Sequence, residues 1–164
     1  MNTSANLDPA QGERIQQRLA GAERLCQSRG HRFTALRRRV LEIILESDRP
    51  LGAYAILDVL RERDGRRGAP PTVYRALDFL LEQGLVHRLA SLNVYAVCDH
   101  PEQRHAGQFL ICAMCGRVRE LDSQVLEQTI RAEAAARHFT VGSQVVEVLG
   151  RCADCQATVN ARGH

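Results

Sequence analysis

The sequence contains no lysine, so all 22 of its basic residues are arginines. It also lacks any apolar run near the roughly 18 residues that a membrane-spanning helix needs. Residues 1–10 do not follow the charged-then-apolar order of a secretory signal. These absences argue against membrane and secreted proteins, and we expect a cytoplasmic protein without a membrane partner.

The charged residues that are present are unevenly placed. Residues 1–92 carry 15 arginines and 11 acidic residues, a net charge of +4, whereas residues 93–164 carry 7 and 8, a net charge of −1. A basic N-terminal half permits nucleic-acid binding without demonstrating it. Five of the six cysteines lie in the second half, and in a reducing compartment closely spaced cysteines favour metal ligation over disulfides.

Apolar residues in the first half recur at helical spacing in four segments separated by turn residues. Thr34 is placed to cap the second segment, and Pro71 suits the first position of the fourth helix, which Gly84 ends. The apolar positions are Ile15, Leu19, Ala22 and Cys26; Leu36, Val40, Ile43 and Ile44; Ala53, Ile56, Leu57 and Leu60; Val73, Ala76, Leu77, Leu80 and Leu81.

Two short β-like segments follow the helices, residues 85–89 and 94–98, with a turn between them. Helices followed by a hairpin predict a winged helix-turn-helix. Beyond a polar hinge, strands are expected at residues 109–112, 117–121 and 145–149, with a helix around Val125 to Ala134 between the last two. So small a unit needs a metal or a partner subunit for stability.

The predicted fold class is therefore α+β, an N-terminal winged helix followed by a small α/β domain. The expected boundaries are a winged helix at 1–98, a hinge at 99–107 and the second domain at 108–164.

Four cysteines form two Cys-x-x-Cys pairs, Cys112 with Cys115 and Cys152 with Cys155. Four thiolates make a closed tetrahedral site for structural zinc. The alternatives are two redox dithiols or buried free thiols. A redox Cys-x-x-Cys normally opens a helix inside a βαβ unit, so two pairs in one small domain favour the structural metal.

A second candidate metal site combines His87, Cys98, His105 and Glu120. If the hairpin turn is Ala90 to Asn93, then His87 pairs with Ala96, and Cys98 lies on the same face two residues on. One thiolate, two imidazoles and one carboxylate form a suitable zinc set. From spacing alone, a surface histidine and an inert buried thiol remain open as readings.

Residues 71–87, PTVYRALDFLLEQGLVH, closely resemble the recognition helix and wing of bacterial zinc uptake regulators in the ferric uptake regulator superfamily. Residues 109–116 and the second cysteine pair resemble the family's two zinc knuckles. The resemblance implies a winged helix and a C-terminal dimerisation domain. It further implies structural zinc on Cys112, Cys115, Cys152 and Cys155, and sensing zinc on His87, Cys98, His105 and Glu120, about two zinc ions per chain.

The expected function is a zinc-responsive repressor of zinc uptake genes that binds, as a homodimer, a palindromic double-stranded operator and takes no small-molecule substrate. Arg75 is suited to a guanine contact through its fork of donors. The residues assigned to DNA are Tyr54, Thr72, Tyr74, Arg75 and Arg37.

Three other functions are possible. The same fold can sense iron, nickel, manganese or peroxide, although the His-His-Asp-His cluster typical of iron and peroxide sensors is missing and a thiolate suits zinc. A zinc enzyme with Glu120 as general base is disfavoured because no His-Glu-x-x-His or deaminase-type motif is present. The third alternative is a thiol redox protein.

Overall fold

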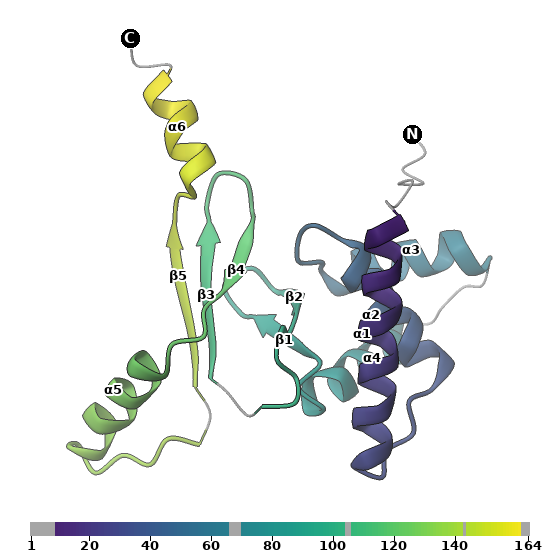
Figure 1. Ribbon diagram of the computed structural model, residues 1–164, viewed down its shortest axis with the longest axis horizontal. Coiled ribbons are helices and arrows are strands. Elements are labelled where there is room, and N and C mark those ends of the chain that lie inside the picture. The colour runs from purple at the N-terminus through teal and green to yellow at the C-terminus, as the bar shows by residue number, and fades with distance from the viewer. Residues whose placement is uncertain (1–8, 66–69, 104–105, 143, 162–164) are drawn as a thin grey trace.

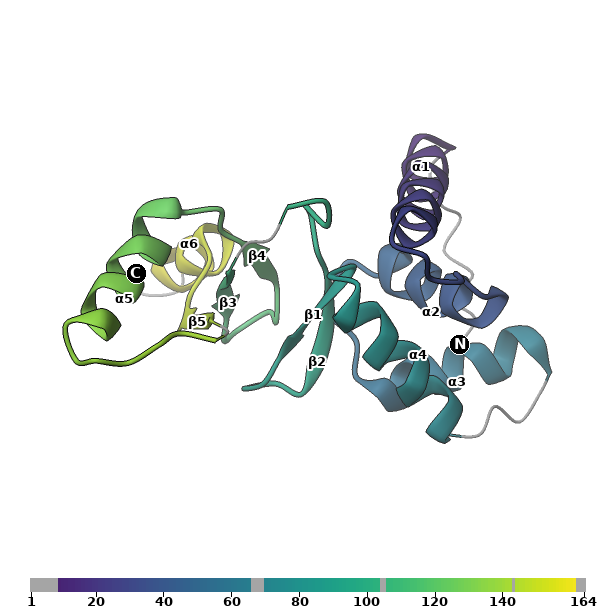
Figure 2. The ribbon, with the colours of Figure 1, turned by 90° about the horizontal axis from the view of Figure 1, so that it is seen from below.

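The computed structural model describes residues 9–65, 70–103, 106–142 and 144–161. Helices α1 to α4 gather on one side of the molecule, and strands β3 to β5 with helices α5 and α6 lie on the other (Figure 1). The β1–β2 hairpin lies between these two parts (Figure 2). Along the described segments, no helix is both long and apolar enough to cross a membrane.

The four expected N-terminal helices are present. They are α1 (Pro9–Ser28), α2 (Ala35–Glu46), α3 (Ala53–Asp64) and α4 (Pro70–Glu82). Thr34 caps α2 by accepting the backbone N–H of Arg37 at 3.4 Å. Nearly all the apolar positions read from the sequence are buried in one cluster with β1 and β2. Phe79, which the apolar stripe omitted, is buried there too.

The end of α4 turns the chain sharply into the hairpin. Gly84 has a φ of +69°, and the backbone N–H of Leu85 donates to the carbonyl of Leu80 at 2.9 Å, which closes the helix as glycine termini commonly do. Strands β1 (Val86–Leu89) and β2 (Val94–Val97) pair antiparallel in the predicted register, with His87 opposite Ala96. The register of the hairpin is therefore the one that the sequence predicted.

The second part contains a three-stranded sheet in the order β4-β3-β5. Its strands are β3 (Gly107–Cys112), β4 (Val118–Glu120) and β5 (Val145–Gly150), and helix α5 (Gln124–Ala135) connects β4 to β5. β3 pairs antiparallel with β4 and parallel with β5. The α+β class with a winged helix and a second α/β unit is confirmed.

One element was missed by the sequence reading. Helix α6 (Ala153–Ala161) follows β5 directly, whereas only a cysteine pair was expected there. Its sequence is short and carries no apolar stripe of helical period, so periodicity could not identify it. The consequence is that Cys152 lies immediately before a helix and Cys155 lies in its first turn.

Candidate metal centres and nucleic-acid interface

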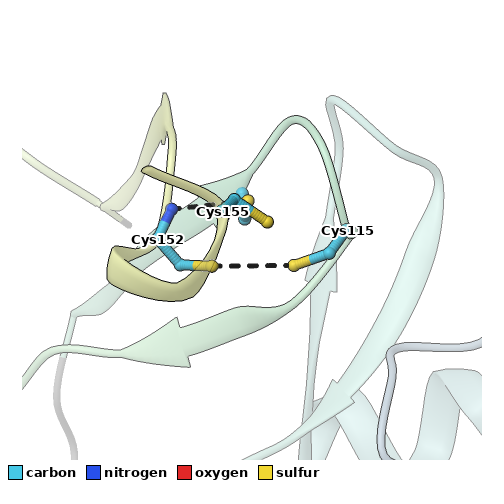
Figure 3. Close-up of side chains that lie close together, drawn as sticks. Cys115, Cys152 and Cys155 are labelled. Carbon is cyan, nitrogen blue, oxygen red and sulfur yellow. Dashed lines mark hydrogen bonds between the residues drawn. The ribbon is translucent and has the colours of Figure 1, made fainter. Parts of the chain in front are cut away.

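The four cysteines of the second part converge at one end of the sheet. Cys112 ends β3, Cys115 lies in the turn that leads to β4, and the other pair lies at the start of α6. One sulfur atom from each of the four lies within 4.8 Å of the others. Figure 3 shows Cys115, Cys152 and Cys155 pointing toward one another across the gap between the knuckle turn and the helix.

The spacing of these sulfur atoms fits a tetrahedral ion better than a disulfide. The Sγ atoms of Cys115 and Cys152 are 3.8 Å apart, far beyond the S–S bond of about 2.05 Å. Four thiolates at about 2.3 Å from one zinc ion lie roughly 3.8 Å from one another. The cluster therefore has the dimensions of a zinc site in which every position is filled by sulfur.

Backbone donors stabilise the thiolate form of Cys112. The backbone N–H of Cys152 donates to the Sγ of Cys112 at 3.4 Å, and N–H groups of Cys152, Cys115 and Met114 together lower the pKa of the Cys112 thiol. Gly116, with a φ of +70°, closes the knuckle turn. Arg117 ties the knuckle to α6 through an ion pair of 2.5 Å with Asp154.

The second cysteine pair shares one feature with a redox Cys-x-x-Cys, because it opens helix α6 directly after β5. No strand follows α6 in the described part of the chain, so the pair does not lie inside a βαβ unit. The structural-metal interpretation is also supported by the gathering of all four sulfur atoms, because a redox dithiol needs only two.

The second cluster joins the two parts of the molecule. His87 on β1, Cys98 just after β2 and Glu120 on β4 each offer a ligand atom within 4.8 Å of the other two. Glu120 Oε1 lies 3.0 Å from His87 Nε2. Tetrahedral zinc bonds of about 2.0–2.3 Å place ligand atoms roughly 3.3–3.8 Å apart, so these three residues fit one ion. His105, the fourth predicted ligand, lies outside the described residues.

This cluster is shielded from water. Cys98 is 1% exposed, and the side chains of His87 and Glu120 are 17% and 8% exposed. Burial, with a smaller contribution from the Glu120 carboxylate, raises the pKa of the Cys98 thiol to about 12. The metal-free thiol is therefore protonated at neutral pH, and a metal that binds has to displace that proton.

Contacts that the sequence did not reveal fix the hinge beside Cys98. Arg18 on α1 donates to the carbonyl oxygen of Cys98 at 2.5 Å and to the Asp99 carboxylate at 3.2 Å. The backbone N–H of Asp99 in turn donates to Glu120 Oε2 at 3.0 Å. Arg18 lies among the exposed residues of α1, where an arginine is ordinary, so no sequence signal marked it.

The residues assigned to DNA lie near the starts of α2 and α3 and along α4. Tyr54 is 69% exposed and Tyr74 is 39% exposed; Thr72 and Arg75 are also exposed. Among the described residues, no carboxylate or carbonyl binds the Arg75 guanidinium, which leaves its donors available. Arg37 differs, because its guanidinium lies 3.4 Å from the centre of the Phe79 ring and donates to the carbonyl of Arg32; its assignment to DNA stays a prediction.

A family model described as the ferric uptake regulator family matches residues 28–149. The chain belongs to the ferric uptake regulator family. The zinc uptake regulation protein of Escherichia coli (strain K12) is 42% identical over 141 residues, which are 85% of this chain and 82% of that protein. The predicted family is confirmed.

This chain is also similar to solved structures of zinc uptake regulators. A zinc uptake regulator complexed with zinc and DNA superposes with a TM-score of 0.84 at 41% identity, covering 90% of this chain and 97% of that chain. The holo form of XcZur gives a TM-score of 0.79 at 42% identity, covering 85% and 96%. The apo form of XcZur gives 0.51 at 40% identity, covering 87% and 97%. At nearly the same identity and coverage, this chain therefore superposes better on the holo form of XcZur than on its apo form.

Proposed function

We propose that this chain is a zinc-responsive repressor of zinc uptake genes that acts in the cytoplasm as a homodimer on double-stranded operator DNA. The observation that carries the proposal is the meeting of His87, Cys98 and Glu120, which come from the wing, the hinge and the second part of the molecule. We also propose a winged helix at 1–98, a hinge at 99–107 and a second domain at 108–164, because this cluster joins segments on either side of that hinge.

Two zinc ions per chain are proposed, one structural and one sensing. Cys112, Cys115, Cys152 and Cys155 would hold the structural ion, and His87, Cys98, His105 and Glu120 the sensing ion. Bound there, zinc supplies a positively charged centre that neutralises the thiolate and the carboxylate and links three segments. Without it, the buried carboxylate of Glu120 and the thiol of Cys98 favour a more hydrated, looser arrangement.

The regulatory step is a shift between arrangements of the chain. Arg18 and the Asp99 backbone hold the hinge against Glu120, so a closed cluster fixes the wing relative to the three-stranded sheet. A ligand shifts such an equilibrium only by its differential affinity for the two states. The better superposition on the holo and DNA-bound relatives than on the apo relative supports a closed, binding-competent arrangement here.

Dimerisation is supported by apolar surface that one chain leaves uncovered. No residue of α5 is buried, and Val145, Val148 and Leu149 on β5 are about half exposed, at 56%, 47% and 58%. β5 is also an edge strand within the described sheet. Exposed apolar side chains along an edge strand and a neighbouring helix typically mark a subunit interface.

The test measures operator affinity against free zinc for the wild type, His87→Ala and Cys98→Ser. We expect tight binding only with zinc in the wild type, and little zinc response in either variant. Cys26→Ala is the control, because Cys26 is equally buried but lies in α1 away from the cluster. Unchanged zinc dependence in both variants would refute the sensing assignment.

The same titration with iron, nickel and manganese tests the nearest alternative. We expect zinc to act at the lowest free concentration, because a thiolate and imidazoles favour it over harder cations. Zinc content measured before and after mild oxidation tests the redox alternative. A thiol redox protein would lose free thiols on oxidation and would contain no stoichiometric zinc beforehand.

A further inference from the structure

Three residues stand side by side across the three-stranded sheet and face the wing. Phe109 on β3 is in register with Glu120 on β4 and with Glu147 on β5. Residues directly opposite one another in neighbouring strands project from the same face of a sheet. Glu120 contacts His87, and the Phe109 ring packs edge-on against the His87 ring at 5.1 Å.

The third residue of the row, Glu147, binds the opposite end of the hairpin. Its Oε1 accepts the backbone N–H of Ala90 at 2.7 Å, and its Oε2 accepts the N–H of Ser91 at 3.1 Å and also the Ser91 hydroxyl. Successive backbone N–H groups of a turn form a binding site for an anionic group. These donors, the hydroxyl first, lower the pKa of the Glu147 carboxyl group.

The contact between Glu147 and the wing turn links the three-stranded sheet to the hairpin. Within the described residues, the Glu147 carboxylate makes hydrogen bonds only to the wing turn, and none to its own sheet or to α5. A small apolar cluster of Leu89, Phe109 and Ile111 lies between this contact and the His87 cluster. The hairpin is therefore held on the sheet at both ends, by the candidate zinc ligands at one end and by a carboxylate at the other.

We propose that Glu147 is a positioning residue for the zinc response: it docks the wing turn on β5 and so favours the closed arrangement before zinc binds. The inference rests on the proposed function, since it concerns the same equilibrium. Glu147 uses only protein atoms, so it acts with and without metal. The apparent dissociation constant for zinc equals the intrinsic constant divided by the fraction of molecules in the closed arrangement. Losing the Glu147 contact lowers that fraction and therefore raises the zinc concentration needed for operator binding.

The experiment compares full-length wild type, Glu147→Gln and Ser91→Ala in operator binding against buffered free zinc. Glu147→Gln removes the negative charge and places an amide donor against the turn's own donors. We expect its midpoint to move to about tenfold higher free zinc, while saturating zinc restores most of the affinity. Ser91→Ala removes one of three donors, so its shift is smaller and in the same direction. The control is Glu133→Gln, because Glu133 is an exposed residue of α5 that pairs with Arg137 just beyond the helix. Its binding curve should superpose on that of the wild type.

Two further readouts separate positioning from damage to the fold. Both variants should keep two zinc ions, and cobalt in the sensing site should give the wild-type thiolate charge-transfer spectrum. The double variant should be no worse than Glu147→Gln alone, because both changes break one contact. Curves that superpose on the wild type, or additive effects of the two changes, would overturn the inference. A wild type without any zinc response would overturn the proposed function instead.

Discussion

Gly107 shows how the absence of a side chain can shape a candidate metal site, here that of His87, Cys98 and Glu120. A Cβ atom built at this position would lie 2.9 Å from Phe109 Cε2 and 3.4 Å from His87 Nδ1, closer than the ring of Phe109 can accept without moving. The glycine thus lets Phe109 pack beside the His87 imidazole, whose Nε2 faces Glu120. Ring orientation set by packing is part of what tunes a metal ligand.

Gly107→Ala should weaken sensing-site zinc binding by about tenfold, because the added methyl group displaces Phe109 or His87. The measurement is competition with a zinc chelator, with total zinc per chain showing that the cysteine site stays filled. Gly142→Ala is the control, since a Cβ there meets no atom within 4 Å. Equal zinc affinities for the two variants would contradict this role for Gly107.

Arg75 is the residue whose substitution should most reduce recognition of the operator sequence. It is exposed on α4, and the fork of an arginine pairs with guanine in the major groove. Arg75→Ala should reduce specific operator binding by about 1–3 kcal/mol and relax base preference at one position of each half-site. Arg137→Ala, in the turn after α5, removes the same charge in the second part of the molecule and should change binding much less. A uniform loss across all sequences would indicate a phosphate contact.

At the scale of elements, local signals predicted most of what positions the site. The four-residue turn fixed the hairpin register, which brought His87 and Cys98 to one face as expected. Helix α6 lacked an apolar stripe, and the contacts of Arg18 and Glu147 depend on which segments become neighbours. The parallel pairing of β3 with β5 aligns Glu147 with Phe109, and no local pattern around residue 147 contains that information.

We expect the stability of α6 and of the adjoining end of the sheet to depend on metal. Among the described residues, the Arg117–Asp154 ion pair and the sulfur cluster join α6 to the knuckle. At free zinc about 1000-fold above the dissociation constant, binding stabilises the folded state by about 4 kcal/mol, or roughly 8–16 °C in melting temperature for a chain of this size.

Cys115→Ser should therefore lower the melting temperature by that amount, leave about one zinc ion per chain, and reduce helical circular dichroism through loss of α6. Differential scanning calorimetry with zinc analysis measures both effects. Cys98→Ser, which removes the other zinc, should leave the α6 signal intact. If the two variants melted alike, the two sites could not have the separate structural and sensing roles.

At the scale of the whole molecule, function requires that two chains present two α4 helices at once. Half-sites one helical turn apart place the recognition helices of a dimer about 34–36 Å from each other. On the proposed function, zinc at the His87 site would orient the wing within each chain, whereas a subunit interface would set the distance between the wings of two chains. In the single chain, β5 and α5 expose apolar side chains that such an interface would cover.

Leu149, which is 58% exposed in the single chain, lies in this surface. Leu149→Asp should shift the protein from dimer to monomer in sedimentation equilibrium, because an unpaired charge is costly to bury. Leu92→Asp, at a 43% exposed apolar position in the wing turn, should remain a dimer. Because each monomer reaches only one half-site, Leu149→Asp should lose operator affinity at saturating zinc while retaining both zinc ions. A dimeric Leu149→Asp variant with wild-type operator binding would place the interface elsewhere on the chain.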